Sequence, residues 1–364
     1  MDDSELPQLT DGDTEAVRLQ SEEHPLIEDA PPATPAEHCL RLMHLRAYDE
    51  AVRHAAGRDV LDVGCNTGYG TLRFTPVARR VVGVDVSPRA IEAARLRAPD
   101  GHPEFVVTNG FALPFADASF DLVTSFQVLE HVPDATAFLG ELARVSRPSG
   151  MVILATPNAA TRLYPGMTPW NRFHVHEYLA DELEGLLRGV FATVTVLGMF
   201  GVPELYETEI RRVDAARQRI RRKEAAATRQ AARAAAAAKA AASRAARPNR
   251  PLPFRIARAV LPGFVRARLR SIVRPPMNGI APRVSVATAQ VDAPVEASPA
   301  VGPPPADLGA FLRLSVDDLF YAPSDLDRAM DLLAICRRSP APRSTEGRLT
   351  GADRPRADRP EPCR

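Results

Sequence analysis

The sequence is poor in cysteine and contains no long apolar run. Its four cysteines, Cys39, Cys65, Cys336 and Cys363, include no pair with the spacing of a metal site or a redox motif. We therefore expect a reducing compartment and no structural disulfides. The N-terminus is acidic and lacks the apolar stretch of a signal peptide, and no apolar run approaches the roughly 20 residues that cross a bilayer. These absences predict a cytoplasmic location, with peripheral contact at the inner face of the membrane left open.

A surplus of charge of one sign is also missing, since the formal net charge of the 364 residues is only +1. The global charge therefore predicts no particular class of partner. Proline is instead abundant, with 34 residues, about twice its usual share. This excess indicates sizeable unstructured segments beside a globular part, for which the apolar fraction of 45% is typical.

The most informative segment is glycine-rich and reads Val60-Leu-Asp-Val-Gly-Cys-Asn-Thr-Gly-Tyr-Gly70. It has the pattern of a buried strand that enters a tight turn and then a helix, and glycine lets the backbone of such a turn approach a ligand closely. A second strand pattern follows and ends in Asp85. An acid at this place in a β–α–β unit can accept the hydroxyls of a ribose. Together the two segments predict a pocket for a nucleoside.

The glycine spacing distinguishes between nucleotide cofactors. Gly64, Gly68 and Gly70 do not follow the Gly-x-Gly-x-x-Gly spacing of dinucleotide-binding proteins, which argues against a dehydrogenase. The segment instead resembles the first motif of the class I S-adenosylmethionine (SAM) dependent methyltransferases, acid-x-Gly-x-Gly-x-Gly, with Asp62 as the acid. Asn66 replaces the middle glycine, and asparagine tolerates the left-handed conformation better than most residues.

Further segments resemble the same family in the same order. In the segment 108–115, Asn109 takes the place of the acid that accepts a hydrogen bond from the adenine amino group, and an Asx turn is its alternative role. The resemblance is closest to the ubiquinone-biosynthesis O-methyltransferases. The other matching segments are 119–133, 141–158 and 171–183, and the whole resemblance covers 37–204 and 319–338.

The resemblance implies SAM as cofactor and assigns roles to particular residues. Glu130, His131 and His174 are expected at the methyl acceptor, where the titration range of a histidine suits a general base. The residues expected to bind SAM are Asp62, Gly64, Cys65, Gly68, Asp85, Val86, Asn109, Gly110 and Gln127.

Some related enzymes bind a divalent metal through a Glu-x-x-Glu-His motif and a later histidine. The matching positions here are Gln127, Glu130, His131 and His174. Because the amide of Gln127 is a weaker ligand than a carboxylate, we predict a site without metal. A packing or capping role for the two histidines is the other alternative.

Apolar strand and helix patterns alternate along the chain. They predict an α/β fold with a doubly wound, mostly parallel sheet of seven strands, as in Rossmann-like methyltransferases. The last strand, 330–337, is expected to run antiparallel between the fifth and sixth, although a helix over 325–337 is an alternative. The predicted parts are a disordered acidic tail over 1–35, a methyltransferase core over 36–204 and 307–338, a basic helical insertion with a Pro-rich linker over 205–306, and a disordered tail over 339–364.

The insertion before the last strand concentrates positive charge. Residues 211–274 contain 19 Lys or Arg against only Asp214 and Glu224, a net charge of +17. The first part is rich in Ala and Arg, which favour helix. A solvated helical arm and a peripheral contact of 252–274 with an anionic membrane are equally favoured. Binding to nucleic-acid phosphates is the less favoured interpretation.

The predicted reaction is O-methylation of a small-molecule, sugar or lipid-linked acceptor. Because SAM supplies the electrophile, the protein needs only to align the acceptor and to help remove its proton. Two alternatives remain. An RNA methyltransferase is suggested by the basic insertion and the two histidines, and a non-catalytic partner protein by Asn66, Asn109 and Gln127, which depart from the family pattern. The sequence predicts neither the identity of the acceptor nor the oligomeric state.

Overall fold

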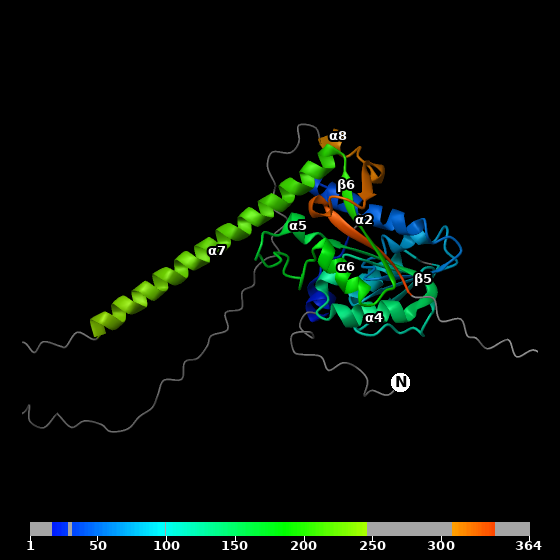
Figure 1. Ribbon diagram of the computed structural model, residues 1–364, viewed down its shortest axis with the longest axis horizontal. Coiled ribbons are helices and arrows are strands. Elements are labelled where there is room, and N and C mark those ends of the chain that lie inside the picture. The colour runs from blue at the N-terminus through cyan, green and yellow to red at the C-terminus, as the bar shows by residue number, and fades with distance from the viewer. Residues whose placement is uncertain (1–16, 28–30, 99, 246–307, 339–364) are drawn as a thin grey trace, which may run out of the picture. The chain divides into compact units, whose positions relative to one another are not determined.

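The computed structural model describes the larger part of the chain (Figure 1). The described residues are 17–27, 31–98, 100–245 and 308–338. The predictions for 1–16, for the Pro-rich linker, for the segment 252–274 and for the tail 339–364 lie outside them. The chain divides into two compact units, one of residues 1–220 with 301–364 and one of residues 221–300.

The strands form one eight-stranded sheet in the order β3-β2-β1-β4-β5-β8-β6-β7. Their bounds are β1 (Asp59–Val63), β2 (Arg80–Asp85), β3 (Glu104–Val107), β4 (Phe120–Phe126), β5 (Ser146–Pro157), β6 (Thr193–Gly201), β7 (Leu319–Ala322) and β8 (Asp331–Arg337). The first five pair in parallel, and β8 is antiparallel to both β5 and β6. The predicted doubly wound α/β sheet is confirmed, including the antiparallel strand over 330–337.

The strand count of seven is too low by one. β7 lies at the edge of the sheet, antiparallel to β6, and pairs Leu319 with Gly201 and Ala322 with Gly198. It contains only four residues, which is too short for a two-residue periodicity to stand out in the sequence. Its place in the sheet depends on pairing with a strand more than 100 residues earlier.

Capping residues mark where several helices begin. The Ser87 hydroxyl accepts a hydrogen bond from the Ala90 N–H, with Pro88 at the first helical position, as the sequence predicts. Asp134 caps the next helix in the same way. The helices are α2 (Pro35–Val52), α3 (Pro88–Leu96), α4 (Ala135–Val145), α5 (Ala159–Arg162), α6 (Ala180–Arg188), α7 (Pro203–Ala245) and α8 (Leu308–Phe311).

The helix expected after the glycine-rich turn is present only as a short remnant. Only a single 3-10 turn, η2 (Thr71–Phe74), follows the glycine-rich loop. Pro76 stands two residues after this turn, and proline has no N–H and clashes with the carbonyl four residues before it. A longer helix therefore cannot form at this position.

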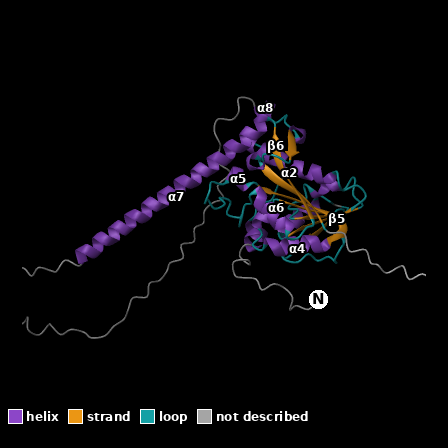
Figure 2. Cartoon of the chain, viewed as in Figure 1, coloured by secondary structure: helices purple, strands orange, loops and turns teal. Residues whose placement is uncertain are grey.

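Helices pack around the strands of the sheet (Figure 2). Alternating side chains of the strands build a core on each face of the sheet. In β4, Val123 belongs to the cluster that contains Leu139 of α4 and Leu183 of α6, whereas Leu122 belongs to the cluster that contains Tyr48 of α2. The central strands are thus buried on both faces and read as continuous apolar runs. The loops after their carboxyl ends meet at one edge of the sheet, where open α/β folds bind ligands.

Helix α7 begins on the core and continues through the Ala/Arg-rich stretch. Leu205, Glu209 and Val213 are buried, whereas the side chains of residues 221–243 are all exposed. The helical character of this stretch follows the Ala and Arg propensities. Among the residues that the structure describes, no helix is long and apolar enough to span a membrane.

The prediction of a disordered tail over residues 1–35 is wrong for residues 17–27. This segment contains a π-helical turn, η1 (Leu19–Glu23), and forms hydrogen bonds to the glycine-rich loop and to the loop that contains Phe173. The acidic composition of this segment favours disorder, and contacts with residues far away in sequence are not visible in composition. Further along, the Thr34 hydroxyl caps α2 by accepting from the Glu37 N–H.

Candidate active site

The glycine-rich loop after β1 has the backbone that the sequence predicts. Gly64 and Gly68 have φ angles of +80° and +74°, and Asn66 is left-handed at +47°. A Cβ at position 64 would lie 2.2 Å from a methyl carbon of Val128, which is closer than nonbonded atoms can approach. Only glycine therefore fits at this position, and the turn brings backbone to the edge of the sheet where a cofactor would lie.

Asp62 lies beneath this loop. Its carboxylate is fully buried and accepts hydrogen bonds from the hydroxyls of Tyr48, Thr71 and Thr124 at 3.1, 2.6 and 2.9 Å. Burial raises the pKa of Asp62 to about 6, and the three hydroxyl bonds oppose that shift. Because its oxygens are held by neighbouring side chains, Asp62 acts as a positioning residue for the loop.

Asp85 ends β2 beside the loop, where a ribose is expected. One carboxylate oxygen accepts from the Asn66 N–H at 2.8 Å and the other from the Ser87 N–H at 2.9 Å. Burial raises the pKa of Asp85, and these backbone bonds partly offset the shift. A carboxylate oxygen has two lone pairs, so each oxygen can still accept from one hydroxyl of a diol. This arrangement fits the ribose of SAM.

The residues expected around the adenine show one correction. Val86 and Gly110 face each other, since a Cβ at Gly110 would lie 3.0 Å from a Val86 methyl carbon. The side-chain oxygen of Asn109, however, accepts from the backbone N–H groups of Phe111 and Ala112, at 3.0 Å each. The Asx turn, which was the alternative role, is therefore what the structure contains, and this oxygen is occupied.

Two other residues expected at the cofactor point elsewhere. The side chain of Cys65 is fully buried and packs with Ile91 and Phe105. Only the backbone of Cys65 is therefore available to a cofactor. The Gln127 amide donates to Asp331 at 2.8 Å. Burial raises the pKa of Asp331 well above its usual value, which makes this pair a buried polar contact between β4 and β8. Asp331 lies about 200 positions further along the chain, so no local pattern indicates this pairing.

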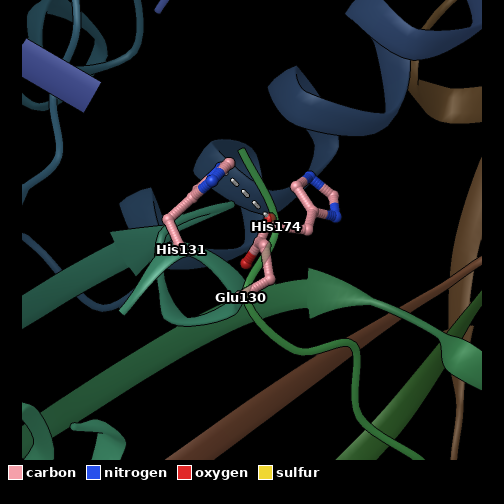
Figure 3. A group of neighbouring side chains, drawn as sticks. All are labelled: Glu130, His131 and His174. Atoms are coloured by element: carbon pink, nitrogen blue, oxygen red, sulfur yellow. Dashed lines mark ion pairs between the residues drawn. The ribbon is translucent and has the colours of Figure 1, made fainter. Parts of the chain in front are cut away.

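Glu130, His131 and His174 come together beside this edge of the sheet (Figure 3). Glu130 and His131 lie on the 3-10 turn η3 (Leu129–His131) after β4, and His174 lies on the loop before α6. One ligand-capable atom from each side chain lies within 4.8 Å of those of the other two. The expected grouping at the acceptor is therefore present in space, although His174 is far away in sequence.

Fixed hydrogen bonds orient both imidazoles. His131 Nδ1 lies 2.7 Å from the Phe173 carbonyl, and His174 Nδ1 lies 2.7 Å from a Glu177 carboxylate oxygen. Since these oxygens only accept, each Nδ1 is assigned the proton that forms its bond. Glu177 is itself held by the Arg162 guanidinium at 2.9 and 3.1 Å.

Burial sets the protonation of this cluster. It raises the pKa of Glu130 to about 7, against the influence of His174 and of the bond from the Thr156 hydroxyl. It lowers the pKa of His131 to about 4, with the neighbouring His174 adding to the shift. His131 is therefore neutral at pH 7, while Glu130 is close to half ionised. A neutral imidazole with a free Nε2 can accept a proton from a bound hydroxyl.

The same cluster has the donor set of a divalent-metal site. One nitrogen of each imidazole and an oxygen of Glu130 lie within 4.8 Å of one another. Nδ1 of each ring bonds a carbonyl or a carboxylate, as in many metal-binding histidines. Gln127, whose neutral amide was the reason for predicting no metal, is bonded to Asp331 instead. The metal-free site stays a prediction, but Gln127 no longer supports it.

Sequence reasoning missed several residues of this site. Gln20 and His24 come from the segment expected to be disordered, and Thr156 lies in β5, inside the matching segment 141–158, but was given no role. Glu177 stood inside a recognised segment, and its spacing of three residues from His174 was the available signal. Arg162 had no signal, since its role depends entirely on Glu177.

Comparisons with known proteins agree with this geometry. Residues 61–154 match the family model described as a methyltransferase domain. The chain is 41% identical over 170 residues to the "Probable S-adenosylmethionine-dependent methyltransferase Rv3030" of Mycobacterium tuberculosis, which covers 46% of this chain and 61% of that protein. A similarly named protein of Mycolicibacterium smegmatis is 40% identical over 172 residues, covering 46% and 65%.

The match to these relatives is partial, since the chain spans less than two thirds of their length. Among solved structures, YcgJ from Bacillus subtilis is 22% identical and aligns with a TM-score of 0.37 over 45% of this chain and 78% of its own. The sequence motifs, the family match and the curated relatives together identify a class I SAM-dependent methyltransferase domain in this chain.

Proposed function

We propose that the protein transfers a methyl group from SAM to a hydroxyl oxygen of a small-molecule, sugar or lipid-linked acceptor. The observation that carries the proposal is the buried cluster of Glu130, His131 and His174 beside the cofactor loop. An acceptor hydroxyl must lose its proton as the methyl group arrives, and this cluster contains a neutral base next to an ionisable carboxylate.

Different residues would bind the cofactor and accept the proton of the acceptor. The loop with Gly64 and Gly68 would hold SAM and Asp85 its ribose, and bound SAM supplies the electrophilic methyl group. His131 accepts the hydroxyl proton on Nε2, because Nδ1 is bonded to the Phe173 carbonyl. Ionised Glu130, 3.9 Å from that Nε2, then stabilises the imidazolium that forms.

Exchange of single side chains tests this assignment. His131→Ala should lower turnover about 10²- to 10⁴-fold, the usual contribution of a general base, and leave S-adenosylhomocysteine binding unchanged. Transfer from tritiated SAM to a panel of catechols, glycosides and lipid extracts measures turnover. His176→Ala is the matched control, because His176 lies on the same segment but bonds the exposed Glu182. Equal activity of the two variants would contradict the role of His131.

A metal-assisted form of the reaction is the second candidate. The grouping of His131 and His174 with Glu130 favours it, and a bound divalent cation would lower the pKa of a coordinated hydroxyl. It includes transfer to the terminal ribose of RNA, which also offers vicinal hydroxyls. Loss of activity on treatment with EDTA, with recovery on addition of Mg²⁺ or Mn²⁺, would separate it from the metal-free form.

A further inference from the structure

The N-terminal strap, residues 17–27, crosses from the cofactor loop to the acceptor cluster. At one end the Asn66 side chain bonds it twice: its oxygen accepts from the Ile27 N–H at 2.9 Å and its nitrogen donates to the Pro25 carbonyl at 3.2 Å. The Thr67 hydroxyl donates to the Ile27 carbonyl at 2.6 Å. Both side chains belong to the glycine-rich loop, so the strap is attached directly to the cofactor site.

At the acceptor side the strap contributes two side chains. His24 packs edge-on against the rings of His131 and Phe173, with centroids 5.3 and 5.0 Å away. The Gln20 amide donates to the Phe173 carbonyl at 3.1 Å, beside the His131 Nδ1 that bonds the same oxygen. The strap therefore forms a wall against the residue proposed as the base.

Additional contacts hold the middle and the start of the strap. The Glu22 carbonyl accepts from Arg89 at 3.4 Å, and Glu23 forms an ion pair with Arg172 at 2.9 Å. Val17 lies near Gly110, on the side where the adenine is expected. Arg89 lies on α3, whereas Arg172 and Gly110 lie on two different loops, so the strap contacts several separate elements.

We infer that the strap is the lid of the active site and that Asn66 and Thr67 latch it to the cofactor loop. SAM and the acceptor enter when the lid is open, and closure places His24 and Gln20 against the acceptor cluster. Cofactor binding and enclosure of the acceptor are then coupled through one segment. This also gives a reason for asparagine where the family pattern has glycine. The inference rests on the proposed function only in requiring a cofactor on this loop.

Two latch variants of the full-length chain test the lid. Thr67→Val removes only the hydroxyl that donates to Ile27, and Asn66→Gly restores the family glycine while removing both side-chain bonds. Thr75→Val is the matched control, because the Thr75 hydroxyl bonds only the nearby Leu72 carbonyl. Each protein is digested with trypsin, with and without S-adenosylhomocysteine, and cleavage after Arg18 within the strap is followed by mass spectrometry. Dissociation of S-adenosylhomocysteine is measured by surface plasmon resonance.

The lid predicts that S-adenosylhomocysteine slows cleavage after Arg18 at least fivefold in the wild type and in Thr75→Val. The protection should be lost in both latch variants, and dissociation should become about tenfold faster, as expected for the loss of one or two ordinary hydrogen bonds. Ligand binding without any protection of Arg18, or unchanged dissociation from both latch variants, would overturn the lid and leave the proposed function intact. A wild type that does not bind S-adenosylhomocysteine would overturn both.

Discussion

Asp62 offers a test of the structure that does not depend on the acceptor. Its carboxylate accepts from three hydroxyls, and Tyr48, Thr71 and Thr124 are themselves almost fully buried. Asp62→Ala leaves the buried hydroxyls of Tyr48 and Thr71 without a partner, whereas Thr124 keeps its longer bond to the Leu61 carbonyl at 3.4 Å. Each unpartnered donor costs about 1–3 kcal/mol, so we expect a loss of at least about 2 kcal/mol in the free energy of unfolding. Asp62→Asn keeps an acceptor oxygen and an NH₂ group toward which a hydroxyl can reorient, so its cost at pH 4 should be about 1 kcal/mol or less.

The raised pKa makes the comparison depend on pH in a defined direction. A carboxyl whose pKa rises from 3.8 to about 6 on folding stabilises the fold fully below pH 3.8, and this stabilisation is lost as the pH rises through 6. The loss amounts to about 3 kcal/mol. Relative to the wild type, Asp62→Asn should therefore be about 3 kcal/mol more stable at pH 8 than at pH 4.

Urea denaturation followed by circular dichroism at the two pH values measures this difference. Asp59→Asn is a control that should show almost no pH dependence between pH 4 and pH 8, because bonds to Arg79 and Arg147 outweigh burial and lower the pKa of Asp59 to about 2. That carboxylate stabilises the fold above pH 3.8 and loses its effect as the pH falls toward 2. A pH-independent Asp62→Asn difference, or an Asp62→Ala cost below 1 kcal/mol, would refute the reasoning.

Two further predictions concern the cofactor loop and the acceptor cluster. Gly64→Ala should weaken S-adenosylhomocysteine binding more than tenfold in calorimetry, because the new Cβ would overlap Val128. The control Gly57→Ala should bind normally, since Gly57 has a similar φ of +67° but no atom within 4 Å of the added Cβ. Equal binding by both variants would contradict the overlap. Turnover should rise with pH through about 7 as Glu130 ionises, and Glu130→Gln should remove this inflection from the pH profile. An unchanged profile would exclude Glu130 as the partner of the imidazolium.

The elements of the fold that are visible in the sequence are those fixed by local chemistry. Buried strands are indicated by continuous apolar runs, and the start of a helix is indicated by a capping residue such as Ser87. β7 has only four residues, which carry too little periodicity to indicate a strand, and Pro76 reduces the helix expected after the glycine-rich turn to a single 3-10 turn. The local pattern is too weak to indicate β7, and after the glycine-rich turn two local patterns oppose each other, one for a helix and one against it.

The parts of the site that could be predicted are those whose backbone position follows from a sequence motif. The expected positions are occupied by Gly64, Gly68 and Asp85. The two glycines directly follow β1, and Asp85 ends the next strand, so all three are placed by short stretches of the sequence. The side-chain partners of Cys65 and Gln127 were not predictable, since they come from other strands and helices. The strap escaped notice for a different reason: an acidic composition is typical of disorder, yet a few specific contacts suffice to place a short segment.

The most direct test of the central claim is calorimetric titration of the purified protein with S-adenosylhomocysteine, with Asp85→Ala as the paired variant. The account predicts micromolar binding to the wild type and its loss in the variant, because the Asp85 carboxylate both orients the loop through the Asn66 N–H and accepts from the ribose. No binding to the wild type, or binding unaffected by Asp85→Ala, would contradict the assignment of a working SAM site.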